Sequence, residues 1–322
     1  MMLRILFIFL LTAVTAIAGS LDEARGLIEE ERFEEARPLL EKALKNSAAE
    51  AEALLLLTRV CNAMEDWESG VKYGKRAVKL LPDETDAHYQ YAVALRMKMS
   101  NVGKTRAMFT IGSYKKGLKT AISLDPTNVD ALTERIGFLI NAPGIAGGDL
   151  DEAEKEVVKL EKIDWLVAKQ MQLGIEMKRE DILGAIKVSE EILKRHPDHA
   201  GTRSALGYLL QRNDQFKEAD VQFAQLVESE DKEVAMAALY QRGRTRVLGN
   251  FQLDEAITMF ETYIERLGAG FSDLPSEAAA LWRIGLAYQN LGQLDHARGA
   301  YESALEIEPD FKEARQSLKK LK

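Results

Sequence analysis

The fold of this chain is decided near its C-terminus, where Ala280 to Asp310 read ALWRIGLAYQNLGQLDHARGAYESALEIEPD. Two apolar stretches with helical spacing flank the turn Leu291-Gly292-Gln293, and glycine suits a left-handed helix end. Pro309 ends the second stretch, because proline cannot donate the next helical hydrogen bond. The small residues Gly285 and Ala297 allow the two helices to cross closely. The stretch therefore predicts a helix–turn–helix unit.

This unit resembles the tetratricopeptide repeat, a two-helix unit of about 34 residues. The matching residues of the first helix are Leu281, Ile284, Gly285 and Tyr288, and those of the second are Ala297, Tyr301, Ala304 and Pro309. The resemblance implies that Tyr288 and Tyr301 fill the space between units. It also implies an all-helical fold in which successive units stack on one another.

The same pattern recurs along the chain. Ala36 and Gly70 occupy the equivalent place in second helices and are one repeat length apart, and Ala219 and Ala256 follow further on. No sustained period-two run predicts a strand. We therefore expect an all-α protein, a right-handed α-solenoid of about eight units over residues 19–312. Insertions are expected near 96–113, 141–149 and 267–277, and a capping helix is expected at 313–322.

The first 18 residues have the features of a signal peptide. Arg4 supplies a positive charge, Ile5 to Val14 is apolar, and Ala16-Ile17-Ala18 fits the small-residue cleavage rule. The apolar run is shorter than the roughly 20 residues that a membrane-spanning helix needs. We expect cleavage after Ala18 and an exported protein, periplasmic or secreted, without a transmembrane segment in the mature chain.

Composition excludes some partners. The chain has 322 residues and a net charge of −8, whereas nucleic-acid binding needs a basic surface, so no nucleic-acid partner is expected. The single cysteine, Cys61, lies in an apolar helical stretch and is predicted to be a buried core residue. No cofactor is expected.

Two stretches resemble phosphate-binding motifs but lack their context. SNVGKTRA, from Ser100 to Ala107, contains the Gly-Lys-Thr of a phosphate-binding loop, but Lys98 stands where that loop needs glycine. We expect it to lie in an extended turn. APGIAGGD, from Ala142 to Asp149, is interpreted as a lengthened turn shaped by Gly147 and Gly148, with Asp149 or Asp151 capping the next helix.

The chain offers no metal-ligand or catalytic motif in a suitable context. His196 and His199 flank Pro197, but two histidines without a third fixed ligand are a weak metal signal. We therefore assign no metal site and no catalytic residue.

The resemblance implies that the first helices of successive units line a groove in which ligands bind. By position, the partner-binding residues would be Tyr240, Gln241, Arg244, Trp282 and Arg283. Aromatic residues and arginine are enriched at binding hot spots, because they bury a large area and carry a polar group. The alternative is that the rings pack against the next unit.

A second candidate surface is basic. From Ala87 to Leu124 there is no Asp or Glu, and the predicted basic rim consists of Lys104, Arg106, Lys115 and Lys116. Such a rim could bind an acidic partner, an anionic polymer or lipid headgroups. The alternative is internal pairing with the acidic residues that follow, which are Asp149, Asp151, Glu152, Glu154 and Glu156.

We therefore expect a non-enzymatic scaffold or adaptor in the cell envelope that binds a partner protein or peptide. One alternative is a carrier or docking module for an anionic polymer or lipid surface. Another is an enzyme subunit whose chemistry lies in the inserted turns. The sequence leaves self-association open.

Overall fold

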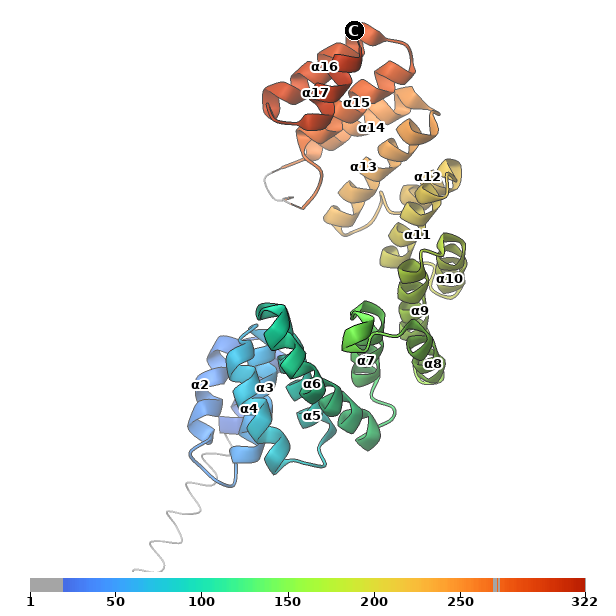
Figure 1. Ribbon diagram of the computed structural model, residues 1–322. Coiled ribbons are helices and arrows are strands. Elements are labelled where there is room, and N and C mark those ends of the chain that lie inside the picture. The colour runs from blue at the N-terminus through green and yellow to red at the C-terminus, as the bar shows by residue number, and fades with distance from the viewer. Residues whose placement is uncertain (1–19, 269–270, 272, 322) are drawn as a thin grey trace, which may run out of the picture. The chain divides into compact units, whose positions relative to one another are not determined.

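The computed structural model describes residues 20–268, 271 and 273–321 (Figure 1). All regular secondary structure in these residues is helical, and none of them forms a strand. Within the same ranges, every helix is too short or too polar to cross a membrane. The predicted signal peptide, residues 1–18, lies outside the described residues.

The helices follow one another as pairs joined by short turns. Residues 20–29 form the first helix and pair with α2 (Phe33–Ala43). In the described residues the later pairs are α3 (Glu50–Ala63) with α4 (Trp67–Leu80), α5 (Thr85–Asn101) with α6 (Lys104–Leu124), α7 (Val129–Asn141) with α8 (Leu150–Leu160), α9 (Trp165–Arg179) with α10 (Ile182–Arg195), α11 (Ala200–Arg212) with α12 (Phe216–Ala224), α13 (Lys232–Gly249) with α14 (Leu253–Arg266), and α15 (Glu277–Asn290) with α16 (Leu294–Ile307). These eight pairs and the final helix α17 (Lys312–Lys320) confirm the predicted all-α repeat architecture.

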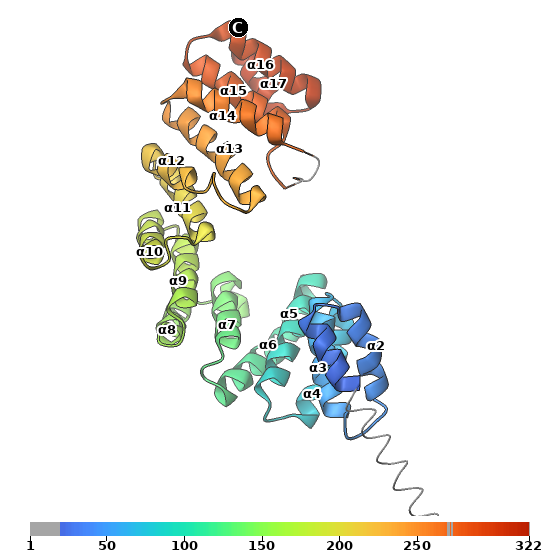
Figure 2. The ribbon, with the colours of Figure 1, turned by 180° about the vertical axis from the view of Figure 1, so that it is seen from behind.

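The chain divides into two compact units, between Met171 and Gln172 within α9. We call them the N-terminal unit and the C-terminal unit and describe each by itself. In the N-terminal unit α6 runs beside α5, as the front and back views both show (Figures 1 and 2).

In the last three helix pairs of the C-terminal unit an aromatic ring of the second helix lies on a glycine of the first helix. A Cβ placed on Gly285 would lie 2.4 Å from the ring of Tyr301. The rings of Phe223 and Phe260 approach Gly207 and Gly243 in the same way. Because a larger side chain would push the helices apart, these contacts confirm the predicted role of Gly285.

The predicted turn and stop signals are also confirmed. Gly292 has φ of 76°, in the left-handed region that glycine adopts without strain. Helix α16 ends at Ile307, two residues before Pro309. Local sequence therefore determines the boundaries of this repeat.

The insertion near 96–113 differs from the prediction, because the extra residues lengthen helices instead of forming a long turn. Helix α5 reaches Asn101 and α6 begins at Lys104, so only Val102 and Gly103 separate them. The Gly-Lys-Thr sequence is the start of α6, and the expectation of an extended turn is wrong. Residues 104–111, the first two turns of α6, contain neither proline nor glycine, so the helix can extend toward α5.

The turn after α7 is built as predicted. A short 3-10 turn, η1 (Gly144–Ala146), leads to Gly147, whose φ of 100° lies in the left-handed region. A Cβ on Gly148 would lie 1.8 Å from the carbonyl oxygen of Ala142, so a side chain there would collide with the backbone. The Asp149 carboxylate caps α8 by accepting hydrogen bonds from the backbone N–H groups of Asp151 and Glu152. The insertion near 267–277 is described only in part.

The structure confirms that Cys61 is a buried core residue. Burial raises the pKa of its thiol to about 11, so the reactive thiolate is scarce near neutral pH. We expect the folded protein to react very slowly with a thiol reagent such as dithionitrobenzoate at pH 8. In urea one thiol per chain should react at once, and rapid reaction of the folded protein would contradict this placement.

Candidate functional site

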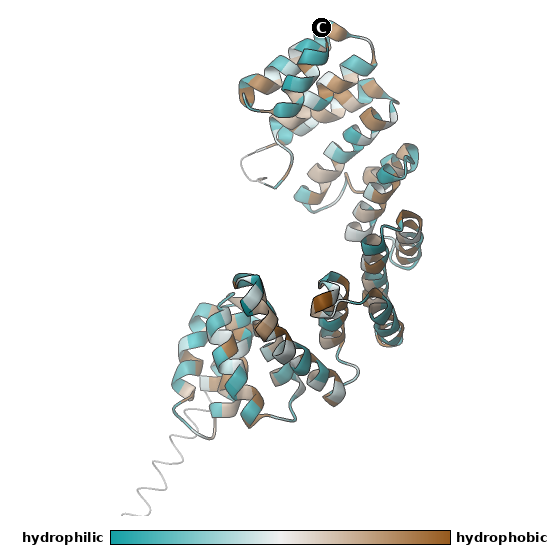
Figure 3. Cartoon of the chain, viewed as in Figure 1, coloured by the Kyte–Doolittle hydropathy of each residue, from teal (hydrophilic) through white to brown (hydrophobic). Residues whose placement is uncertain are grey.

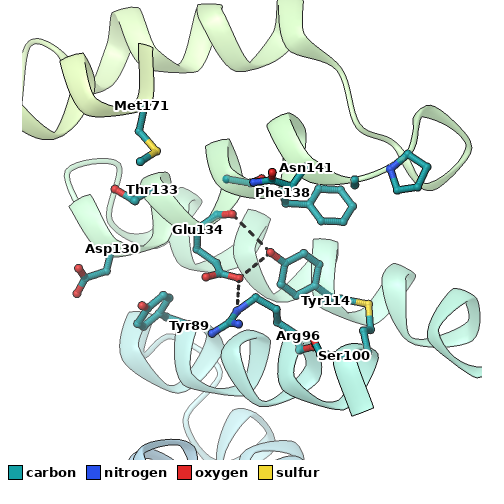
Figure 4. A pocket seen from close by; sticks show the side chains of 14 residues that line it. Tyr89, Arg96, Ser100, Tyr114, Asp130, Thr133, Glu134, Phe138, Asn141 and Met171 are labelled. Carbon is teal, nitrogen blue, oxygen red and sulfur yellow. Dashed lines mark hydrogen bonds and ion pairs between the residues drawn. The ribbon is translucent and has the colours of Figure 1, made fainter. Parts of the chain in front are cut away.

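A cleft in the N-terminal unit is the candidate functional site (Figure 4). Its volume is about 680 Å³, within the range of roughly 300–1,000 Å³ that is typical of ligand pockets. Helix α5 contributes Tyr89 and Arg96, α6 contributes Tyr114, and α7 contributes Glu134 and Phe138. The cleft therefore depends on the way in which these helices pack.

A hydrogen-bonded group lies on one side of the cleft. The Tyr114 hydroxyl donates to Glu134 Oε1 at 2.8 Å, and Arg96 Nε lies 3.0 Å from the same oxygen (Figure 4). Burial, together with the Glu134 charge, raises the pKa of Tyr114, so its phenol remains a donor. The Tyr114 ring also contacts Phe138, with 5.2 Å between ring centroids. These contacts fix the aromatic wall before any ligand binds.

Thr133, Asp130 and Tyr89 add further polar groups to the lining of the cleft. The Thr133 hydroxyl oxygen is buried and has no hydrogen-bond partner among the described residues. Asp130 is exposed at the edge, and burial followed by the charges of Asp130 and Glu134 raises the pKa of Tyr89 to about 12. Met99 and Met171 add flexible apolar walls. The arrangement suits a mixed apolar and polar ligand such as a peptide.

Sequence reasoning missed this cleft. Tyr114 and Glu134 bond to each other from different repeats, and no motif marks such a pair. The available signal is weak: Tyr89, like Tyr240, is an aromatic residue on the first helix of a pair. Recognising the cleft required knowing that the extra residues continue α5 and α6 as helices.

Two of the predicted groove residues in the C-terminal unit pack against neighbouring helices. Tyr240 is only 5% exposed, and its ring contacts Phe260 and Tyr263 with centroid distances of 5.4 and 5.2 Å. Its assignment to an open groove is wrong, because the next helix places two rings against it. Trp282 donates from Nε1 to Ser317 Oγ at 3.0 Å and packs edge-on against Phe311. Its indole thus attaches α17 to the repeat.

The polar part of the predicted groove remains a candidate. Arg244 donates to Gln211 Oε1 at 2.5 Å and to Gln241 Oε1 at 3.2 Å. The Arg283 guanidinium lies 4.3 Å from the centroid of the Trp282 ring, and its Nε is buried without a hydrogen-bond partner. Burial and the Arg283 charge lower the pKa of Arg244. The positive charges of Arg244 and Arg283 therefore repel each other, and neither side chain forms an ion pair with a described carboxylate.

The predicted basic rim is exposed. Lys104, Arg106, Lys115 and Lys116 all lie on α6, and none of them pairs with a carboxylate in the described part of the chain. Two of the expected acidic partners pair with other cations: Glu152 pairs with Arg135, and Glu156 lies 3.1 Å from Lys159 Nζ. The alternative of internal pairing is therefore not observed for these four cations.

The predicted histidine turn serves the fold. His199 Nδ1 accepts a hydrogen bond from the Thr202 N–H at 3.1 Å and caps α11. Over the residues that the structure describes, His, Cys, Asp and Glu side chains form no group of three or more that could hold a metal ion.

Comparison with known proteins identifies the repeat. Models of the tetratricopeptide repeat family match residues 21–85 and 278–311. YrrB, described as a tetratricopeptide repeat protein with an unusual peptide-binding site, has 20% identity and a TM-score of 0.50, covering 63% of this chain and 97% of its own. No curated protein matches.

Two further solved structures are similar but more remote. A tetratricopeptide repeat protein of Thermus thermophilus has 17% identity and a TM-score of 0.49, with coverage of 60% of this chain and 98% of its own. One from Parabacteroides merdae has 9% identity and a TM-score of 0.47, with coverage of 95% and 99%. The two family matches identify residues 21–85 and 278–311 as tetratricopeptide repeats.

Proposed function

We propose that this tetratricopeptide repeat protein is an exported, non-enzymatic scaffold of the cell envelope that binds a segment of a partner protein. Its repeats make it a protein-interaction module, and YrrB, with the same fold, is described as having a peptide-binding site. The observation that carries the proposal is the cleft between α5, α6 and α7. Export rests on the N-terminal sequence, residues 1–18.

The chemistry of the cleft favours a peptide ligand. The rings of Tyr89, Tyr114 and Phe138 and the two methionines can bury an apolar side chain. The exposed Asp130 carboxylate can accept hydrogen bonds from backbone N–H groups of an extended segment. Glu134 already accepts a hydrogen bond from Tyr114 and forms an ion pair with Arg96. Its role is therefore to fix the position of the aromatic wall.

Arg244, Gln241 and Arg283 form a second proposed contact, within the C-terminal unit. Two partly buried cations without a counterion favour an incoming anion, so an acidic side chain of the partner would bind there. Arg is suited to this role, because its planar guanidinium bonds a carboxylate through two donors.

Gly137 allows the cleft to be filled without disturbing the fold. It lies within α7 and lines the cleft, and a Cβ there would meet nothing within 4 Å. We expect Gly137→Leu to block partner binding while the melting temperature stays unchanged or rises, since helical glycine costs roughly 0.5–1 kcal/mol relative to alanine. The measurement is affinity capture from envelope extract with residues 19–322, quantified by mass spectrometry, beside a thermal melt.

Gly299→Leu is the matched control, because Gly299 lies in α16 and a Cβ there also meets nothing within 4 Å. It should capture the same partners as the parent protein. Arg244→Gln in the same assay tests the second contact. Equal capture by Gly137→Leu and the parent would show that the cleft is not the binding site.

A further inference from the structure

One long face of α6 is basic and apolar and is not covered by neighbouring helices. At about 100° per residue, the buried residues Thr110, Tyr114, Gly117, Leu118 and Ala121 share one side of the helix. The opposite side is exposed and carries Lys104, Met108, Phe109, Lys115, Lys116 and Lys119. This helix is therefore amphipathic in an unusual sense, because its outer face combines cations with large apolar side chains.

The apolar residues of this face are strongly exposed. Phe109 is 83% exposed and Met108 is 48% exposed. Single exposed apolar residues are common, but two adjacent ones among cations form a local feature that the fold does not explain.

The loop after α7 adds a third apolar side chain next to this face. Ile145, in η1, is 88% exposed. Figure 3 shows that α6 itself carries both hydrophilic and hydrophobic colour. A Cβ on Gly147 would lie 2.5 Å from Lys115 Nζ, and both residues line one small cavity with Tyr114. The loop and the face of α6 are therefore adjacent in the N-terminal unit.

The charge of this surface is opposite to that of the whole protein. The chain has a net charge of −8, yet residues 87–124 contain no Asp or Glu. The cations of α6 are not neutralised by ion pairs within the described residues, as shown above for the basic rim. A strong positive field therefore extends from this face.

The geometry points to a specific partner: we propose that the exposed face of α6, with Ile145, binds the surface of an anionic lipid bilayer. Lysine, a point charge on a flexible stem, suits the fluid headgroup layer. Phe109, Met108 and Ile145 would enter the boundary between headgroups and acyl chains, as the apolar residues of interfacial helices do. A hydrated anionic polymer offers no apolar phase for these three side chains, so the lipid surface fits better.

This inference is independent of the peptide cleft. Binding would place the N-terminal unit at the membrane through α6, while Gly137 and the cleft lie on other residues. Failure of one proposal therefore leaves the other standing.

The test uses the mature chain, residues 19–322, and sedimentation with vesicles. One set is pure phosphatidylcholine, and the other contains about one-third phosphatidylglycerol, which supplies the anionic surface. We expect binding to the anionic vesicles to be at least about tenfold tighter and to be lost at about 1 M salt, where the screening length falls to about 3 Å. Equal binding to both vesicles would overturn the proposal.

Two variants assign the effect to residues. Replacing the four lysines of this face, Lys104, Lys115, Lys116 and Lys119, together with Gln should abolish binding to the anionic vesicles. The control replaces other exposed lysines without ion pairs, Lys194, Lys217, Lys312 and Lys319, and should leave binding nearly unchanged. If both sets behave alike, net charge alone is responsible and the assignment to α6 fails.

The apolar part distinguishes lipid from polymer. Phe109→Ser with Ile145→Ser should weaken vesicle binding severalfold, whereas Leu183→Ser, at a site 66% exposed in the C-terminal unit, should not. The parent protein and the Phe109/Ile145 variant should bind dextran sulfate equally. Unchanged vesicle binding by that variant would overturn the lipid proposal in favour of a purely electrostatic surface. Gly137→Leu should bind vesicles like the parent.

Discussion

Tyr301→Ala is expected to destabilise the last repeat by about 3–5 kcal/mol, the usual cost of removing a large buried ring. Tyr301 is 0% exposed and fills the space above Gly285, where no other side chain can substitute for it. Its hydroxyl also donates to Gln289 Oε1 at 2.8 Å. Because repeats unfold locally, the measurement is hydrogen exchange of the α15 and α16 amide groups in the full mature chain.

Two controls separate the ring from its hydroxyl and from its helix. Tyr301→Phe keeps the ring and should cost only about 1 kcal/mol, the net value of one hydrogen bond. Leu294→Ala, also in α16 but at a site that is 49% exposed, should have a small effect. If Tyr301→Ala leaves amide protection unchanged, the ring does not hold these helices together.

The sequence predicted those parts of the fold that depend on neighbouring residues. The Gly285–Tyr301 contact, the left-handed Gly292 and the Asp149 cap all lie within one repeat or one turn. The repeat spacing also gave the order of helices. It could not show which helix covers a given side chain, and for this reason Tyr240 and Trp282 were assigned to a groove although Phe260 and Ser317 contact them.

The candidate cleft was beyond sequence reasoning for a similar physical reason. The number of residues shows that the third repeat is long. It does not show whether the extra residues form a loop or lengthen the helices. The continuous helices α5 and α6 place Arg96 and Tyr114 beside Glu134 of the next repeat. The basic face was easier to predict, because a long stretch without acidic residues is visible in the sequence. The sequence does not show that its cations lack ion pairs, because this depends on Glu152 pairing with Arg135 and Glu156 with Lys159.

A buried charge network in the C-terminal unit leads to the second large effect, and no sequence motif marks it. Arg246 is 3% exposed, and its Nε and Nη2 atoms each lie 3.0 Å from an oxygen of Asp220. Arg242 Nε lies 3.0 Å from Asp220 Oδ1, and Arg246 Nη1 also contacts Glu255. Asp220 in α12 thus holds α13 of the following repeat by its charge.

Asp220→Asn should therefore cost about 3–5 kcal/mol, because removing one partner leaves the Arg246 charge buried and incompletely compensated. Urea unfolding of the mature chain, with hydrogen exchange of α12 and α13, measures this cost. The double variant Asp220→Leu with Arg246→Met removes both buried charges and should recover most of the lost stability, since apolar residues of similar volume often replace a buried ion pair without loss. Arg242 and Glu255 remain partly exposed in that variant and can be hydrated. If Asp220→Asn costs less than about 1 kcal/mol, Glu255 and solvent are enough to compensate the charge of Arg246. The ion pair between repeats is then not a major source of stability.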